Sequence, residues 1–420
     1  MMAEAGHQPL GCRMEYPRWV KVRQNLDGSR DECPALSVEK QLVSFEKQLS
    51  FKKGDKIAIT VGSRYIANLV PITKAVVDFI RFRGGQPFLV PAMGSHGGAT
   101  AEGQTEVLAE YGFTEEALGV PILSSMDVDL LGEVCGIPVF IDRHAHAAEG
   151  IVVINRVKPH QVFKGEIQSG LNKMLAVGLG KKKGADAVHS SGQTDVLGTI
   201  GDFIRSKVPV LFGVAILENS YDETKEVAVV LPDRFREIDR TWVKVSRAVM
   251  PKIPFRNLDL AIVSEMGKDI SGSGMDTNVI GFTRRIDTMG QVAVPLAVLD
   301  LTAKTDGNAI GIGLADFTTE RLVRQIDRHK TYTNVLATGV FSAGRIPITL
   351  ESERAIVDLI LGASAVPREP RMIKIKNTLE LEHFFVTEAL VPEVEMNNAL
   401  SLDGPLLETR FDDSENIVFR

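Results

Sequence analysis

The sequence contains few cysteines and no long apolar run, and each absence excludes a class of protein. Cys12, Cys33 and Cys135 are its three cysteines, and they form no CxxC pair. That argues against a disulfide framework and against a cysteine-based zinc site. No run of about 18 apolar residues is present that would span a bilayer. The first residues show no basic and apolar signal pattern, so we expect a cytoplasmic protein without membrane partners.

The charge balance excludes another class of partner. The net charge is −6 at pH 7, and 24% of the residues are charged. A chain of this charge has no bulk attraction for nucleic acid, so we expect no nucleic-acid partner. The chain has 420 residues, which is long for one hydrophobic core, and we therefore expect two domains.

Strand and helix patterns alternate along the first half of the chain. Strands are expected at 56–61, 87–91, 150–154 and 210–216, with a helix after each of the first two. This order predicts a parallel sheet. Pro251 and Pro254 interrupt any regular element, so we place the domain boundary there. The expected fold is α/β, with two α/β domains, mostly parallel sheets and an active-site cleft between them.

The two expected domains have different roles. Residues 1–254 are expected to form an N-terminal cofactor-binding and catalytic domain. Residues 255–420 are expected to form a C-terminal α/β domain, and its last strands have the pattern to return to the first domain. The functional centre is expected at 155–189, directly after a buried strand, because ligands in open α/β sheets bind at the carboxyl ends of strands. We expect a long loop there, and its apolar residues argue for burial rather than disorder.

Two histidines follow expected strands. His96 lies in Gly94-Ser95-His96-Gly97-Gly98, and His160 follows Pro159. A glycine-rich loop before a helix favours anions, although it lacks both the Walker lysine and the GxGxxG pattern, and the alternative is a tight turn with an incidental histidine. A single loop histidine is typical of a protein surface. A pair supplies the proton acceptor and donor that inversion of a carbon centre requires.

Further candidate residues each have an alternative interpretation. Lys173, among apolar residues, is either an amine nucleophile of lowered pKa or a surface lysine. His189 is a candidate metal ligand. The lysines at 181–183 are expected to be solvated. Three more residues are candidates for binding a substrate carboxylate or the groups next to it: Arg64, Glu265 and Lys268. Alternatively, Glu265 and Lys268 form a local ion pair.

Taken together, these motifs resemble the nickel-pincer-nucleotide lactate racemase family, a superfamily of 2-hydroxyacid racemases and epimerases. The resemblance runs in order over most of the chain. It implies that His96 and His160 are the catalytic acid/bases and that Lys173 carries the cofactor covalently. It also implies that His189 binds nickel, because it follows Lys173 by 189 − 173 = 16 positions, the spacing of the family.

The resemblance also implies a cofactor, its contacts and a reaction. A nickel-bound pyridinium dithio-pincer mononucleotide would accept hydride from the 2-hydroxyacid while a histidine takes the hydroxyl proton, and imidazole suits nickel. Cofactor-biosynthesis proteins are implied partners. Cofactor contacts are expected from the glycine-rich loop, through Gly94, Ser95 and Gly97. Substrate contacts are expected from Arg64, Glu265 and Lys268.

Four departures from the family pattern border the substrate rather than the cofactor. Val61 stands where the lactate enzymes have Asp, Gly97-Gly98 where they have Arg-Pro, and Glu265 where they have Gln. The interval from His160 to Lys173 is longer. A carboxylate is a good acceptor for hydroxyl donors, and glycines leave room. We therefore expect a substrate larger and more hydroxylated than lactate, such as a sugar acid epimerised at C2.

Two other functions are compatible with the motifs. One is a lyase or dehydratase that uses a Lys173 imine or a simple divalent metal without the pincer. The other is a non-catalytic protein that binds an anion or nucleotide. The 16-residue spacing argues against the first, and the pairing of His96 with His160 argues against the second.

Overall fold

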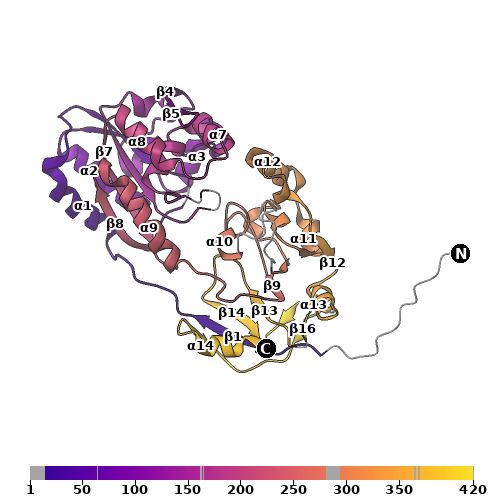
Figure 1. Ribbon diagram of the computed structural model, residues 1–420. Helices are drawn as coiled ribbons and strands as arrows, with labels where there is room; N and C mark the ends of the chain where they lie inside the picture. Colours follow the sequence, from indigo (N-terminus) through magenta and orange to yellow (C-terminus); the bar gives the residue numbers. More distant parts are fainter. Residues whose placement is uncertain are drawn as a thin grey trace. The chain divides into compact units, whose positions relative to one another are not determined.

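The computed structural model describes residues 15–63, 65–160, 163, 165–280, 294–363, 366, 367 and 369–419. The chain divides into two compact units (Figure 1). One is Asp27–Met250, and the other is Pro251–Arg420 together with the segment that precedes Asp27. The division therefore lies between Met250 and Pro251 rather than after 254. The expected cleft between the domains stays a prediction.

The unit Asp27–Met250 is built on a five-stranded sheet with the order β3-β2-β6-β7-β8. The first four strands run parallel, and β8 is antiparallel to β7. Strand β6, after which the sequence predicted the ligand-binding segment, lies between the parallel strands β2 and β7. The strands are β2 (Lys56–Val61), β3 (Gln86–Pro91), β6 (Gly150–Arg156), β7 (Val210–Glu218) and β8 (Thr224–Val230).

Alternating side chains of this sheet pack into two separate cores. Ile57 and Ile59 face one core with α1 and α2, whereas Ala58 faces the other with α8 and α9. A parallel sheet covered on both faces requires such apolar strands. The helices are α1 (Pro34–Phe45), α2 (Leu69–Phe82), α3 (Ala101–Glu110), α4 (Glu115–Leu118), α5 (Arg143–His146), α8 (Leu197–Lys207) and α9 (Phe235–Val249).

The second unit contains an eight-stranded sheet with the order β12-β11-β10-β9-β13-β14-β1-β15. Its first five strands are parallel and the remaining pairings are antiparallel. Both units thus confirm the α/β class with mostly parallel sheets. The parallel strands are β9 (Leu260–Val263), β10 (Leu296–Val298), β11 (Phe317–Thr319), β12 (Ile348–Leu350) and β13 (Met372–Ile375). The helices are α10 (Thr277–Ile280), α11 (Glu320–Gln325), α12 (Arg328–Thr338), α13 (Glu353–Leu361) and α14 (Val391–Met396).

The ends of the chain meet in this second unit. β1 (Trp19–Gln24) pairs with β14 (His383–Thr387) and β15 (Leu400–Leu402). The start of the chain therefore belongs with the C-terminal sheet rather than with the first domain, and β14 and β15 do not return to the first domain. Strands β16 (Arg410–Phe411) and β17 (Ile417–Val418) form a hairpin. The pairing of β1 with β14 and β15 joins strands far apart in sequence, so no local sequence pattern predicts it.

The stretch predicted to be a long loop is helical from Leu171 onward. α6 (Leu171–Lys173) continues into a π-helical turn (Met174–Gly178), and α7 (Lys181–Ser190) follows. The apolar side chains are buried as predicted: Ile167, Leu171, Met174, Leu175, Val177 and Leu179. Three glycines and a lysine run hide the helical period, and a π turn shifts its phase. Such turns frequently occur at functional sites.

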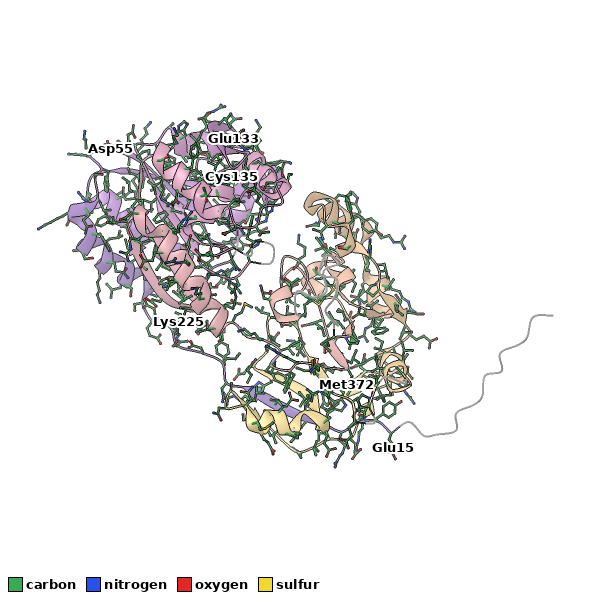
Figure 2. All side chains as sticks on the ribbon, in the orientation of Figure 1. Glu15, Asp55, Glu133, Cys135, Lys225 and Met372 are labelled. Carbon is green, nitrogen blue, oxygen red and sulfur yellow. The ribbon has the colours of Figure 1, made fainter. Side chains whose placement is uncertain are left out.

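A hairpin of β4 (Val128–Val134) and β5 (Ile137–Asp142) completes the first unit. Cys135 lies exposed in its turn (Figure 2), and Cys33 is also an exposed free thiol. Cys12 lies outside the described residues. Over the residues with described structure, no helix has the length and apolar character needed to cross a bilayer.

Candidate active site

Three loops leave the carboxyl edge of the first sheet side by side. Ser63 follows β2, His96 follows β3 and His160 follows β6. Because β2 pairs with both β3 and β6, the ends of the two outer strands are separated by two strand spacings, about 10 Å. The structure therefore brings both predicted histidines to one edge, with Ser63 in the loop after the strand between them.

His96 is exposed and its imidazole contacts a residue that the sequence did not indicate. The Nδ1 atom of His96 is hydrogen-bonded to the Ser63 hydroxyl. A serine hydroxyl both donates and accepts, so this contact is compatible with either tautomer of the ring and orients it in both. The only signal in the sequence is that Ser63 also follows a strand end.

The glycine-rich loop packs tightly rather than forming an open anion cradle. The Gly94 N–H donates to the Gly178 carbonyl at 3.2 Å, and the His96 N–H donates to the Met93 carbonyl at 3.2 Å. These two donors are therefore used within the protein. Gly97 has φ +64°, and a Cβ there would lie 2.6 Å from the backbone of α3. Ser95 is exposed, and cofactor binding by Gly94, Ser95 and Gly97 stays a prediction.

Three other predicted residues surround Phe163. The ring of His160 lies 5.0 Å and that of His189 5.4 Å from the Phe163 centroid. The Lys173 Nζ lies 5.5 Å from the same centroid, a cation–π contact. Phe163 is only 1% exposed. The aromatic ring is thus shared by His160, Lys173 and His189. Phe163 was not predicted as a site residue, because a buried phenylalanine usually belongs to the hydrophobic core.

Electrostatics around Phe163 favour neutral His189. His189 is exposed at the surface, but partial burial of its side chain lowers its pKa; the Lys173 charge acts in the same direction, and the Asp186 charge opposes both effects. A neutral imidazole is the form that binds metal ions. The Lys173 side chain is half-buried, with its ammonium against Phe163 rather than extended along the surface.

A buried carboxylate fixes the start of the helical segment that carries Lys173. Asp239, from α9, accepts hydrogen bonds from the Leu171 and Asn172 N–H groups, both at 2.9 Å, and from the Asn172 side chain at 2.7 Å. Gly170 has φ +89°, and a Cβ there would lie 2.0 Å from Asp239. Glycine is therefore required at 170. The cap itself was unpredictable, because Asp239 lies 68 positions from Leu171.

Asp239 makes stability depend on pH in a direction that can be tested. Burial raises its pKa from the usual 3.8 to about 7, against the opposing N–H donors. A raised carboxyl pKa gives stabilisation that is complete below the unfolded pKa and lost as pH rises to the folded one. The advantage of the wild type over Asp239→Asn in unfolding free energy should therefore shrink between pH 3.8 and about 7. The upper bound on that change is about 4 kcal/mol.

Urea denaturation of both proteins at several pH values across this range measures the difference. The comparison isolates Asp239, because all other titrating groups are common to both proteins. A difference that grows with pH would mean that the N–H donors outweigh burial and that the carboxylate is ionised in the folded protein.

The triple lysine is not uniformly solvated, which corrects the prediction for Lys181. Lys182 and Lys183 are exposed, but Lys181 is 0% exposed and has φ +50°. Its ammonium lies 3.4 Å from the carboxylate of Asp142, which is also 0% exposed. Burial lowers the pKa of Lys181 and raises that of Asp142, while their mutual attraction opposes both shifts. Sequence composition cannot distinguish a lysine whose ion-pair partner is 39 residues away, since 181 − 142 = 39.

The predicted substrate-binding residues fall into two groups. Arg64 lies outside the described residues. Glu265 and Lys268 belong to the second unit, where the Asn377 side chain donates to Glu265 at 3.0 Å and the Lys268 ammonium donates to Asn334. Glu265 follows β9 and Asn377 follows the neighbouring parallel strand β13, so both lie at the carboxyl edge of that sheet. Their role toward a substrate stays a prediction.

Within the described ranges, no three His, Cys, Asp or Glu side chains are grouped to hold a metal ion. A metal at His189 would therefore need further ligands from a cofactor. His146, to which the sequence analysis gave no role, pairs with Asp129 at 2.8 Å on the surface.

Comparison with known proteins gives structural neighbours only. No family model matches the chain, and no curated protein matches it. Among solved structures, a protein from Thermotoga maritima is 14% identical, with a TM-score of 0.48 over 74% of this chain and 82% of its own. The lactate racemase apoprotein from Thermoanaerobacterium thermosaccharolyticum is 12% identical, with a TM-score of 0.47 over 91% of this chain and 96% of its own. Likeness at this level does not carry activity, substrate or cofactor from one protein to another.

Proposed function

We propose that this protein racemises or epimerises a 2-hydroxyacid with a nickel-pincer nucleotide. His96 and His160 act as the acid/bases, Lys173 holds the cofactor covalently and His189 binds its nickel. One observation carries the proposal: His160, Lys173 and His189 surround Phe163, next to the sheet edge from which His96 also projects. These four residues are separated in sequence and have the chemistry that the reaction requires.

The residues present fit such a cofactor. Lys173 offers a half-buried amine for a covalent bond, and His189 offers an imidazole whose lowered pKa favours the metal-binding form. Lys173 ends α6, whose start Asp239 anchors, and His189 lies in α7, which follows after the π-helical turn. Imidazole is a suitable ligand for nickel. When bound, the cofactor would supply a hydride acceptor for the α-carbon of the substrate.

The two histidines then differ in what they offer the substrate hydroxyl. The Phe163 N–H donates to His160 Nδ1 at 3.2 Å, so neutral His160 carries its proton on Nε2. His96 is oriented by Ser63, whose hydroxyl supports either tautomer. His96 can therefore take the hydroxyl proton as the 2-ketoacid forms, and His160 can give a proton to the ketone oxygen from the other side when the 2-hydroxyacid is formed again. The two histidine loops leave strands on either side of β2, so a small substrate bound at this sheet edge can be approached from two sides.

The substrate class rests on the surroundings of the loop and on Glu265. Among the described residues, none has an atom within 4 Å of where a Gly98 Cβ would lie, so the loop is open on that side. Glu265 is oriented by Asn377, and a held carboxylate accepts hydrogen bonds from hydroxyl groups. We therefore propose a sugar acid, epimerised at C2, rather than lactate.

A substrate panel tests this proposal. Cofactor-loaded protein is incubated with sugar acids, aryl 2-hydroxyacids and alkyl 2-hydroxyacids, and inversion at C2 is followed by chiral chromatography. We expect inversion at C2 for at least one sugar acid and slower inversion of lactate. If lactate or another simple alkyl hydroxyacid is faster than every sugar acid, the assignment of Glu265 is wrong.

A further inference from the structure

A buried polar network lies against the loop that carries His96. Gln104, on α3, is 0% exposed. Its amide NH₂ donates to the Gly94 carbonyl at 3.0 Å and to the His96 carbonyl at 3.3 Å. Its amide oxygen accepts a hydrogen bond from Lys181 Nζ at 3.0 Å. Every hydrogen bond of this side chain therefore joins the His96 loop to the start of α7.

Lys181 extends the network to the sheet and to a counter-charge. Its ammonium also donates to the carbonyl of Pro91, the last residue of β3. Asp142 lies 3.4 Å away and accepts from the Ala145 N–H at 2.9 Å. The positive φ of Lys181 is a strained backbone conformation that surrounding contacts must hold. The network therefore holds Lys181 as well as the His96 loop.

The chemistry of the network requires a glutamine at 104. Two carbonyl oxygens need a donor, and the ammonium of Lys181 needs an acceptor. A glutamine amide supplies both ends, whereas a glutamate has the same shape but only acceptors. The orientation of the amide is thus set by its partners on both sides.

We propose that Gln104 is a positioning residue for His96, oriented by Lys181 at the start of the same helix that carries His189. The role in catalysis rests on the proposed function, whereas the effect on His96 does not. Through Gln104, the loop with the acid/base and the helix with the metal ligand are held in one arrangement. The buried Gln104 amide donates a hydrogen bond to the backbone carbonyl of His96. Loss of this bond is therefore expected to move the His96 imidazole away from the Ser63 hydroxyl.

Gln104→Glu tests the proposal with a change of one group. The variant still accepts from Lys181, but it places a carboxylate oxygen against the Gly94 and His96 carbonyls. Gln41→Glu is the matched control. Gln41 lies on α1, and its amide bridges Val227 and Val229 of β8 in the same two-sided way. Both variants lose an amide donor that is bonded to backbone, but only one lies next to His96.

The measurement is hydrogen–deuterium exchange at the C2 atom of each histidine, read by mass spectrometry on the full-length protein without substrate. We expect a several-fold change in the exchange rate of His96 in Gln104→Glu and no change in Gln41→Glu. His329 and His383, both in the second unit, serve as internal references that should stay constant. The proposal is overturned if the His96 exchange rate is unchanged in Gln104→Glu, or if it changes equally in Gln41→Glu.

A second variant covers the case in which Gln104→Glu does not fold. Gln104→Met removes the donors without adding a charge, and the same change at His96 is expected. This outcome is independent of the substrate panel. If no substrate of the panel is inverted but the His96 exchange rate changes specifically, the proposed function is contradicted and the positioning role of Gln104 is supported.

Discussion

His96→Ala and His160→Ala are each expected to reduce turnover by roughly 10²–10⁴-fold, the contribution typical of a general acid or base. The two histidines follow strands on either side of β2, so neither is placed to take over the other's role. Nickel content should stay unchanged in both variants, since His189 and Lys173 are intact. Initial rates of C2 inversion and metal analysis of the same samples give both quantities.

The matched control is His146→Ala, because His146 lies in the same unit and pairs with Asp129 on the surface. That variant should retain the wild-type rate. Full activity in His96→Ala or in His160→Ala would show that the acid/base roles belong to other residues.

Lys181→Met is expected to lower the free energy of unfolding by about 3–5 kcal/mol, the usual cost of removing one partner of a buried ion pair. The variant leaves the Asp142 carboxylate buried without its counter-charge, and Gln104 loses its donor. Lys182→Met and Lys183→Met are controls from the same run of lysines, and their exposed side chains predict little change. Urea denaturation of the three variants provides the comparison.

Adding Asp142→Asn to Lys181→Met should recover part of the lost stability, because it removes the unpaired charge. The recovery will be incomplete, since Asp142 also caps α5 through the Ala145 N–H. Equal destabilisation by all three lysine variants would contradict the structural distinction between buried Lys181 and its exposed neighbours.

Much of the fold could be predicted because its signals are local. The apolar strands at 56–61, 87–91 and 150–154 were recognisable as β2, β3 and β6. The pairing of β1 with β14 was not predictable, because its partners lie at opposite ends of the chain. The helical segment after Leu171 was missed because glycines, lysines and a π turn obscure its period.

The candidate site could be predicted only in part, for a related reason. Strand-end positions indicated His96 and His160, because ligand-binding loops of parallel sheets follow the strands. The residues that hold them in place come from elsewhere: Ser63 from another loop and Gln104 from α3. Lys181 was predicted to be solvated because a lysine run is usually exposed, and its burial depends on Asp142 in a separate hairpin.

We propose that Lys173 and His189 together hold a nickel-containing cofactor. Intact mass, peptide mapping and metal analysis of protein purified from a cofactor-producing host test this proposal. We expect a covalent adduct on Lys173 with nickel in the same sample, no adduct in Lys173→Arg, and an adduct with reduced nickel in His189→Ala. Unmodified Lys173, in protein from a host shown to load a related racemase, would contradict the account.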